Sequence, residues 1–189
     1  MIYSDRVAAA FELANRLHRD QRRKGSDVPY ITHLMGVASL VGEFGGGEDQ
    51  VIAALLHDAV EDQGGVSTLE RIRSGFGNAV AGYVEGCTDA YTEPKPPWES
   101  RKRAFIESLQ GAPEALQLIV AADKLHNLRT MVSDYREAGE ALWERFTKGR
   151  DGVLWYHGEV LAALEEGWDH PILRELRSVY EGLQRDALG

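Results

Sequence analysis

The sequence contains a single cysteine, Cys87, among its 189 residues. One thiol cannot form an intramolecular disulfide or a cysteine-rich zinc site, so both are excluded as sources of stability, and we assign Cys87 no role. A long uncharged apolar run is also missing, because the first 20 residues carry charges within their apolar positions. This pattern excludes a signal peptide and a membrane span there, and we expect a cytoplasmic protein.

Positive charge is in deficit, since 21 Lys and Arg face 30 Asp and Glu and the formal net charge is −9. Proteins that bind the phosphate backbone of nucleic acids usually carry a basic surface, so we expect neither a nucleic-acid nor a membrane partner. A small anionic substrate remains compatible with this charge, because a pocket can be basic within an acidic protein. The composition leaves the oligomeric state open.

Proline is scarce, with 6 residues, and no segment alternates apolar and polar positions as a half-buried strand would. Apolar residues instead recur at helical spacing along most of the chain. We therefore predict an all-α fold, with one domain over residues 1–189 and about 8–10 helices. Three prolines fall in residues 92–98, TEPKPPW, which we predict to be a loop. Two helices, at about 151–166 and 170–187, complete the predicted bundle.

Capping residues and glycines set the predicted helix ends. Ser4 is a candidate N-cap for the first helix. Gly64-Gly65 stop a helix that opens at Glu48. Ser67-x-x-Glu70 has the pattern of a capping box, which predicts a short helix there. Another helix is predicted from Phe76 to about Asp89.

Four polar residues interrupt otherwise apolar helical patterns: His33, the adjacent pair His57-Asp58, and Asp123, which we call the quartet. His33 heads the apolar stripe of a helix that starts near Thr32, and Asp123 stands where a Leu would be expected. An unpaired buried carboxylate is strongly disfavoured, so Asp123 requires a cation, hydrogen-bond donors or a metal. Each residue alone has an ordinary structural explanation. Together, two imidazoles and two carboxylates predict an N/O site for Mn²⁺, Fe²⁺ or Zn²⁺.

Two further groups lie near the quartet in the sequence. Glu61 and Asp62 follow the His57-Asp58 pair by one helical turn and are candidates to orient or deprotonate a water, with a plain acidic helix end as the alternative. The basic run at 22–24 precedes His33, and it is either a phosphate clamp or a solvated surface. A metal, a water nucleophile and a basic clamp predict hydrolysis of a phosphate ester or anhydride.

Several stretches of the sequence resemble a known family. The quartet fills the H…HD…D pattern of the HD phosphohydrolases, and HRDQRRKGSDVPYITH, ALLHDAVEDQGG and ADKLHNLRTM are similar to the hydrolase domain of the RelA/SpoT family. The resemblance is best over residues 4–135. It points to the stand-alone small alarmone hydrolases, which include the metazoan SpoT homologue. Since 189 residues leave no room for synthetase, TGS or ACT regions, it implies a dedicated hydrolase.

The resemblance implies an Mn²⁺-dependent pyrophosphohydrolase that removes the 3′-diphosphate from ppGpp or pppGpp and leaves GDP or GTP. It implies that the quartet (His33, His57, Asp58 and Asp123) holds the metal and that Glu61 and Asp62 act on the nucleophilic water. It also implies five substrate contacts: Arg23, Lys24, Lys124, Asn127 and Arg129.

The sequence departs from the family pattern at Leu34 and Gln63, where Pro and Thr are usual, and in the segment TEPKPPWESRKR. No departure removes a predicted ligand, but guanine selectivity does not follow from the resemblance. Two alternatives stay open: a hydrolase of another nucleotide (ppApp-type alarmones, NADPH or nucleoside phosphates), and a metal-stabilised module that binds nucleotides without hydrolysing them. Tyr156 is a candidate to stack on a base. The other histidines, which we interpret as surface or packing residues, are His18, His126, His157 and His170.

Overall fold

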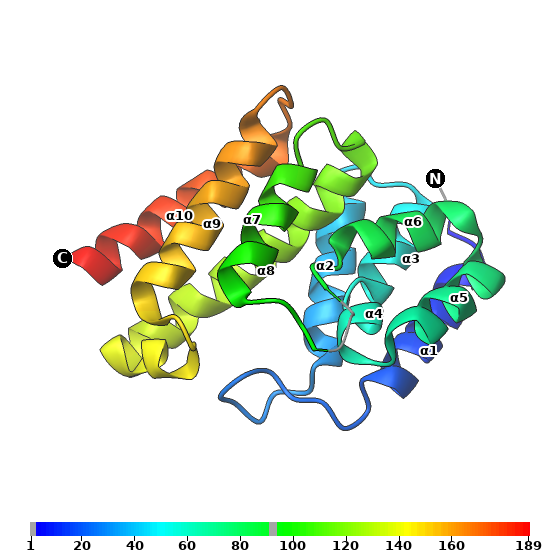
Figure 1. Ribbon diagram of the computed structural model, residues 1–189, viewed down its shortest axis with the longest axis horizontal. Helices are drawn as coiled ribbons and strands as arrows, with labels where there is room; N and C mark the ends of the chain where they lie inside the picture. Colours follow the sequence, from blue (N-terminus) through cyan, green and yellow to red (C-terminus); the bar gives the residue numbers. More distant parts are fainter. Residues whose placement is uncertain (1–2, 91–93) are drawn as a thin grey trace.

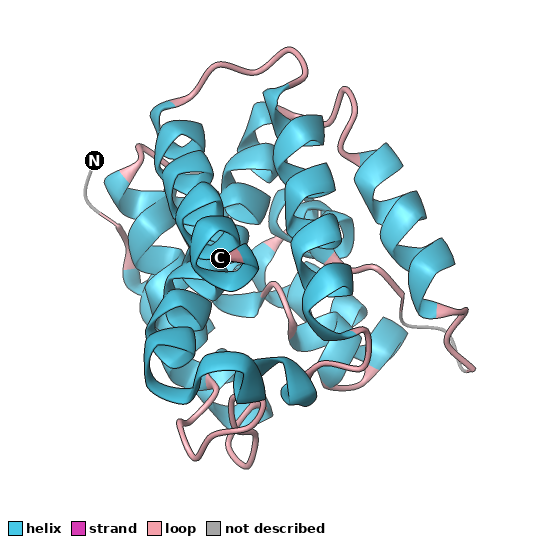
Figure 2. Cartoon of the chain, turned by 90° about the vertical axis from the view of Figure 1, so that its left-hand side faces the viewer, coloured by secondary structure: helices cyan, strands magenta, loops and turns pink. Residues whose placement is uncertain are grey.

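The computed structural model describes residues 3–90 and 94–189 (Figure 1). Across these ranges the regular elements are all helices, as Figure 2 shows, and the all-α prediction is confirmed. In chain order they are α1 (Asp5–Leu17), α2 (Ile31–Glu43), α3 (Glu48–Leu56), α4 (Ala59–Asp62), α5 (Gly65–Phe76), α6 (Asn78–Cys87), α7 (Trp98–Ser108), α8 (Glu114–Ala138), the 3₁₀ helix η1 (Gly139–Arg145), α9 (Gly149–Glu165) and α10 (Pro171–Leu188).

Helix α8 lies at the centre of the molecule (Figure 1). It packs against α2, α3 and α6, and also against α9 and α10, which lie on its other side in this view. Its N-terminal half is buried around most of its circumference, and the residues 117–123 are buried without interruption. A helix that is apolar on several faces belongs in the interior of a bundle. Side chains of α8 can therefore meet groups from both halves of the fold.

The first helix begins as predicted, since the Ser4 side chain accepts a hydrogen bond from the backbone N–H of Arg6. The predicted capping box at Ser67 is wrong. Helix α5 already begins at Gly65, and the Ser67 hydroxyl donates to the carbonyl of Gly64 from inside the first turn. Gly64 adopts a φ of +112°, so the glycine pair turns the chain into the new helix earlier than the pattern indicated.

The helix predicted from Phe76 to about Asp89 is shorter in the structure. Phe76 is the last residue of α5, and Gly77, with a φ of +93°, separates it from α6 at Asn78–Cys87. Gly77, in the left-handed conformation, ends α5 and starts α6. The apolar positions before it therefore belong to α5, and those after it to α6.

The helix predicted from Glu48 through Asp62 is interrupted in the middle. Helix α3 ends at Leu56, and the four-residue helix α4 begins at Ala59, so His57 and Asp58 form the junction. Asp58 has φ −94° and ψ −3°, which lies in the sparsely populated bridge region of backbone conformation. The prediction of one continuous helix is therefore wrong at the residues that matter most for the site.

Two connecting segments flank the region that becomes the site. The basic loop between α1 and α2 folds back on itself, because the Arg23 N–H donates to the Val28 carbonyl at 2.8 Å and the Tyr30 N–H to the Gln21 carbonyl at 3.0 Å. In the predicted loop at 92–98, Thr92 and Glu93 lie outside the described residues, while residues 94–97 precede α7 without helical structure. The sequence did not predict η1.

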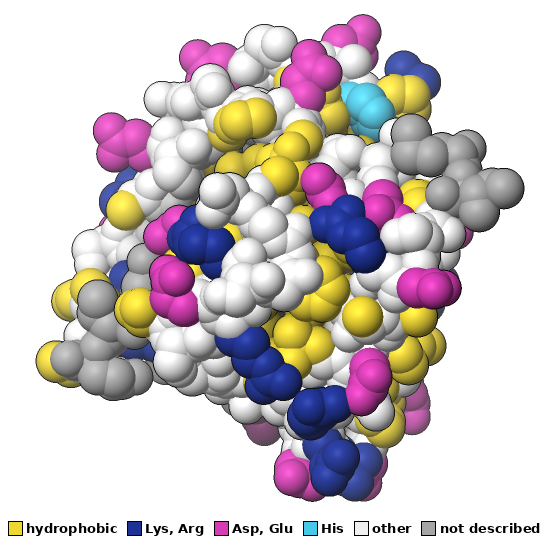
Figure 3. Space-filling model, turned by 90° about the vertical axis from the view of Figure 1, so that its right-hand side faces the viewer, with side chains coloured by type: hydrophobic (Ala, Val, Ile, Leu, Met, Phe, Trp, Pro, Cys, Tyr) yellow, Lys and Arg dark blue, Asp and Glu magenta, His cyan; other side chains and the backbone are white. Residues whose placement is uncertain are grey.

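Within the described ranges, no helix is both long and apolar enough to cross a bilayer. Figure 3 shows one face of the molecule, on which Lys and Arg side chains are interspersed with Asp and Glu. On this face, charges of both signs give the surface its ordinary solvated character.

Candidate metal centre

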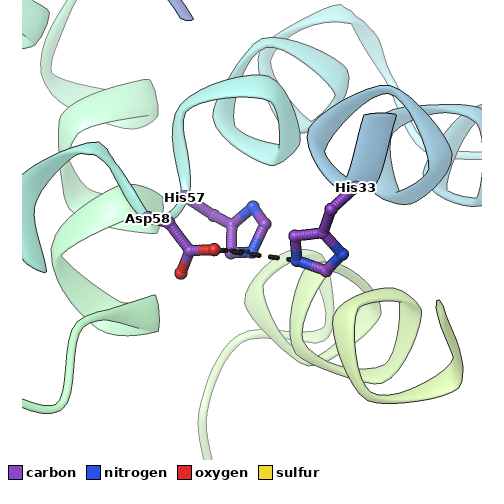
Figure 4. Close-up of side chains that lie close together, drawn as sticks. All are labelled: His33, His57 and Asp58. Atoms are coloured by element: carbon purple, nitrogen blue, oxygen red, sulfur yellow. Dashed lines mark ion pairs between the residues drawn. The ribbon is translucent and has the colours of Figure 1, made fainter. Parts of the chain in front are cut away.

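The quartet comes together from three separate parts of the chain. His33 lies on α2, His57 and Asp58 form the junction between α3 and α4, and Asp123 lies on α8. The distance from His33 Nε2 to Asp123 Oδ1 is 3.2 Å, and that from His57 Nε2 to Asp58 Oδ2 is 3.1 Å. The two crossed distances, His33 to Asp58 and His57 to Asp123, are both 3.6 Å. Figure 4 shows His33, His57 and Asp58 pointing toward one another.

The donor atoms of His33, His57 and Asp58 all lie within 4.8 Å of one another, which fits one shared divalent ion, and Asp123 Oδ1 adjoins this group through the two imidazoles. Two donors that are each about 2.1 Å from an ion lie about 3.0–3.6 Å apart when they occupy neighbouring coordination positions. The Nε2 atom of His57 is buried and makes no hydrogen bond, although Asp58 is only 3.1 Å away. Its nitrogen is therefore directed at the shared centre rather than at the neighbouring oxygen, which is the arrangement that a metal requires.

The charges of the quartet also favour a cation at its centre. Burial alone would raise the pKa of Asp58 and Asp123, but His57 beside Asp58 and Lys124 beside Asp123 hold both pKa values well below the usual range. Burial alone would lower the pKa of His57, and the charges of the two carboxylates outweigh it and hold that pKa well above its usual value. Two ionised carboxylates thus draw positive charge to this point, and a divalent ion satisfies the same requirement.

The helix junction explains how two adjacent residues face one centre. On a continuous helix their side chains would diverge by about 100°. The change of direction at Asp58 removes this divergence. The His57 ring is held by its second nitrogen, since Nδ1 donates to the carbonyl of Ala54 at 2.8 Å in the last turn of α3. That bond leaves Nε2 free to coordinate.

Three neighbouring side chains donate hydrogen bonds to the carboxylates of the quartet, each at 2.6 Å. The Tyr30 hydroxyl donates to Asp58 Oδ2, Asn127 Nδ2 donates to Asp123 Oδ1, and Lys124 Nζ donates to Asp123 Oδ2. Burial and the charge of Asp58 raise the pKa of Tyr30, so its hydroxyl keeps its proton. The sequence interpretation missed Tyr30, although its position three residues before His33 was a usable signal.

A cavity of about 480 Å³ adjoins the quartet. Tyr30, Lys124 and Asn127, which contact the quartet, also form part of its wall. Although the chain is acidic overall, six cationic side chains line this cavity: Arg23, Lys24, Lys102, Lys124, Arg145 and Lys148. Aromatic rings line it as well: Tyr30, Trp98, Phe146 and Tyr156. A cavity of this size and character can take an anionic ligand that carries a planar ring.

Four of the five predicted substrate residues line this cavity: Arg23, Lys24, Lys124 and Asn127. Arg23 Nη2 donates to Asn127 Oδ1 at 2.7 Å and so links the basic loop to α8. Arg129 does not join them. Its guanidinium pairs with Glu175 of α10, because six helical residues after Asp123 correspond to a rotation of about 600° and place it on another face of α8.

Glu61 and Asp62 lie on α4, just beyond the junction. Glu61 pairs with Lys95 at 3.3 Å, and Asp62 accepts a hydrogen bond from Gln21 Nε2 at 2.7 Å. Burial raises the pKa of both carboxyl groups. The negative charge of Asp89 raises the pKa of Glu61 further, and that of Asp58 raises the pKa of Asp62 further. Since the junction redirects α4, these two residues do not extend the surface of α3 as the sequence suggested.

One of the remaining histidines contacts the quartet. His126 lies on α8, and its Nδ1 is 3.0 Å from Nδ1 of His33, so the interpretation of His126 as a surface or packing residue is wrong. Burial lowers its pKa to about 4. His18 is a packing residue that stacks on the Tyr30 ring at 5.2 Å. His157 is buried in the cavity wall, where burial lowers its pKa to about 3.

The chain is similar to several known proteins. Residues 10–154 match the model of the HD domain family. The guanosine-3′,5′-bis(diphosphate) 3′-pyrophosphohydrolase MESH1 of Homo sapiens is 42% identical over 125 residues, which are 65% of this chain and 67% of that protein. The Xenopus tropicalis protein of the same name is 40% identical over 128 residues, 66% of this chain and 69% of that protein. A probable GTP pyrophosphokinase of Mycobacterium leprae is 40% identical over 127 residues, but these are only 16% of its length.

Solved structures show the same fold. A metazoan ortholog of SpoT, which hydrolyses ppGpp, matches with a TM-score of 0.81 and 28% identity over 99% of both chains. A protein of Listeria monocytogenes EGD-e matches with a TM-score of 0.72 and 30% identity over 81% of this chain and 99% of that one. The HD family match spans the quartet and most of the helices described above. This chain belongs to the HD domain family.

Proposed function

We propose that this chain is an Mn²⁺-dependent pyrophosphohydrolase that removes the 3′-diphosphate of ppGpp or pppGpp and leaves GDP or GTP. The observation that carries the proposal is the meeting of four nitrogen and oxygen donors beside a cavity lined by cations. The substrate is supported by relatives about 40% identical that bear this activity in their names.

In this proposal the quartet holds one divalent ion. Imidazole and carboxylate ligands together suit Mn²⁺ as well as Fe²⁺ or Zn²⁺, and the choice of Mn²⁺ follows the family resemblance. When bound, the ion would offset negative charge on the phosphate and lower the pKa of a water. Tyr30 and Asn127 orient the two carboxylates, and Ala54 orients the His57 ring.

The cations of the cavity hold the diphosphate in place. Arg23 lies at the end of a hydrogen-bonded chain that runs through Asn127 to Asp123, so a phosphate held by Arg23 is positioned relative to the quartet. Lys124 is bonded to Asp123 and lines the cavity, so it offers a point charge at the boundary between the two. Tyr156 and Trp98 line the cavity, where Lys102 and Lys124 lie over the Tyr156 ring and Lys148 over the Trp98 ring, so a base that stacks on either ring displaces a cation that then meets the phosphates.

Glu61 and Asp62 orient the water, and one of the two carboxylates accepts its proton as the water oxygen attacks the phosphorus that is bonded to the 3′-oxygen. Their raised pKa values suit this role, because a carboxylate accepts a proton more readily when its pKa lies closer to the working pH. The bond between this phosphorus and the 3′-oxygen breaks, pyrophosphate departs with the oxygen of the water, and the proton taken from the water passes to the 3′-oxygen to give the 3′-hydroxyl of GDP or GTP.

The test is product release from ppGpp by metal-stripped protein, with and without added Mn²⁺, beside ppApp and NADPH. We expect pyrophosphate from ppGpp only when Mn²⁺ is present, and loss of turnover in Asp58→Ala. Asp169→Ala, at an exposed position, is the matched control.

Three other outcomes would contradict the proposal. Full activity of Asp58→Ala would overturn the metal mechanism. Turnover of ppApp or NADPH without turnover of ppGpp would overturn the substrate. Metal binding with no turnover of any nucleotide would favour the non-catalytic binding module.

A further inference from the structure

His126 lies behind the quartet rather than within it. It follows Asp123 by three residues on α8, so the two side chains share a face of that helix. Its Nδ1 lies 3.0 Å from Nδ1 of His33, and the two rings meet edge to face with centroids 4.9 Å apart. His126 therefore contacts the nitrogen of His33 that faces away from the carboxylates, since His33 Nε2 lies 3.2 Å from Asp123.

A glycine on α2 provides the space for this contact. A Cβ atom on Gly36 would lie 2.2 Å from both Cδ2 and Nε2 of the His126 ring, which is far inside any real contact distance. Gly36 is one turn beyond His33 on the same helix, and glycine within a helix costs roughly 0.5–1 kcal/mol relative to alanine. The ring of His126 thus reaches His33 only because this position carries no side chain.

The position of the protons follows from the geometry. If His33 Nε2 is to coordinate a cation, its lone pair must be free and the ring proton must be on Nδ1. That N–H then donates to Nδ1 of His126. The His57 ring is arranged in the same way, because its Nδ1 donates to the Ala54 carbonyl while Nε2 faces the centre. Both imidazoles of the quartet are therefore held from behind, one by the backbone and the other by a side chain.

We infer that His126 is a positioning residue that fixes the ring orientation and the tautomer of His33 for metal binding, and that Gly36 admits it to that place. Ligating histidines typically depend on such a partner at the second ring nitrogen, and loss of the partner lowers metal affinity about 10- to 100-fold. The inference rests on the proposed metal site but names a residue that does not itself touch the ion.

The test is the affinity of the metal-stripped protein for Mn²⁺ in the absence of nucleotide, measured from the EPR signal of free Mn²⁺. His126→Phe keeps a ring but removes the acceptor, and we expect it to weaken binding about 10- to 100-fold. His126→Asn places an oxygen near the former Nδ1, and it should restore much of the affinity. Gly36→Ala should weaken binding as His126→Phe does, because it displaces the same ring from the other side.

The control is His170→Phe, since His170 lies at the start of α10 beside Trp168 and away from the quartet. The unfolding temperature of each metal-free variant separates loss of affinity from loss of fold. Wild-type affinity in both His126→Phe and Gly36→Ala would overturn the inference while leaving the metal site intact. Failure of the wild-type protein to bind Mn²⁺ would overturn the metal site itself, and the inference with it.

Discussion

Removal of one oxygen atom, by Tyr30→Phe, should weaken metal binding without disturbing the fold. The Tyr30 hydroxyl donates to Asp58 Oδ2 at 2.6 Å, and this is the oxygen that lies 3.1 Å from His57 Nε2. The ring itself stays supported, because it stacks on His18 with an interplanar angle of 17°. The substitution therefore removes a hydrogen bond and little packing.

The magnitude follows from what such a donor does for a metal ligand. Loss of a hydrogen-bond partner that orients a ligating side chain typically lowers metal affinity about 10- to 100-fold. An ion at the quartet would share the charge of Asp58, so the effect should fall in the lower part of that range. We expect the dissociation constant for Mn²⁺ to rise about 10- to 30-fold.

Isothermal titration of metal-stripped protein with Mn²⁺ measures this change directly. Tyr180→Phe is the matched control, since its hydroxyl donates to the Leu154 carbonyl at 3.2 Å, between α10 and α9. Unchanged affinity in Tyr30→Phe would refute the argument that donors behind the carboxylates orient them for the ion. An equal loss in Tyr180→Phe would also refute it, because the effect would then not depend on the quartet.

Three further changes have defined outcomes. Asn127→Ala breaks the link between Arg23 and the quartet, and KM for ppGpp should rise about tenfold or more in steady-state assays. Asp89→Asn leaves two cations of α7 without their buried carboxylate, which is 3% exposed, and urea unfolding should show a loss of about 3 kcal/mol. Burial lowers the pKa of His157 to about 3, so below about pH 6.5 the unfolded state binds a proton that the folded state does not. The free energy of unfolding should therefore decrease as the pH is lowered from about 6.5 to 3, by up to about 1.4 kcal/mol per pH unit. His157→Leu should flatten that slope in urea unfolding.

The long helices were predictable from the sequence, whereas several of the breaks between helices were not. Periodic apolar positions identified the long helices, including α8, because their buried faces persist over several turns. The positions of the breaks between helices were harder to predict. The Gly64-Gly65 pair indicates a helix end, but Gly65 is also the first residue of α5. The sequence does not show that Gly77 alone both ends α5 and begins α6.

The four side chains that meet in the structure were identifiable from the sequence, but the groups that hydrogen-bond to them were not. A carboxylate at a Leu position, Asp123, is visible in the sequence because burial of charge is costly. The junction at His57-Asp58 is not visible, since the apolar pattern continues through it and only tertiary contacts redirect α4. His126 and Tyr30 were missed because each looks like an ordinary packing residue until its hydrogen-bond partner, 93 or 28 residues away in the chain, is known.

Anomalous diffraction from a crystal grown with Mn²⁺ tests the central claim most directly, because it locates the ion independently of activity. We expect one strong peak about 2.0–2.3 Å from the Nε2 atoms of His33 and His57 and from one carboxylate oxygen each of Asp58 and Asp123. A peak elsewhere, or no peak at the quartet at a saturating concentration of Mn²⁺, would contradict the claim that these four side chains hold the metal.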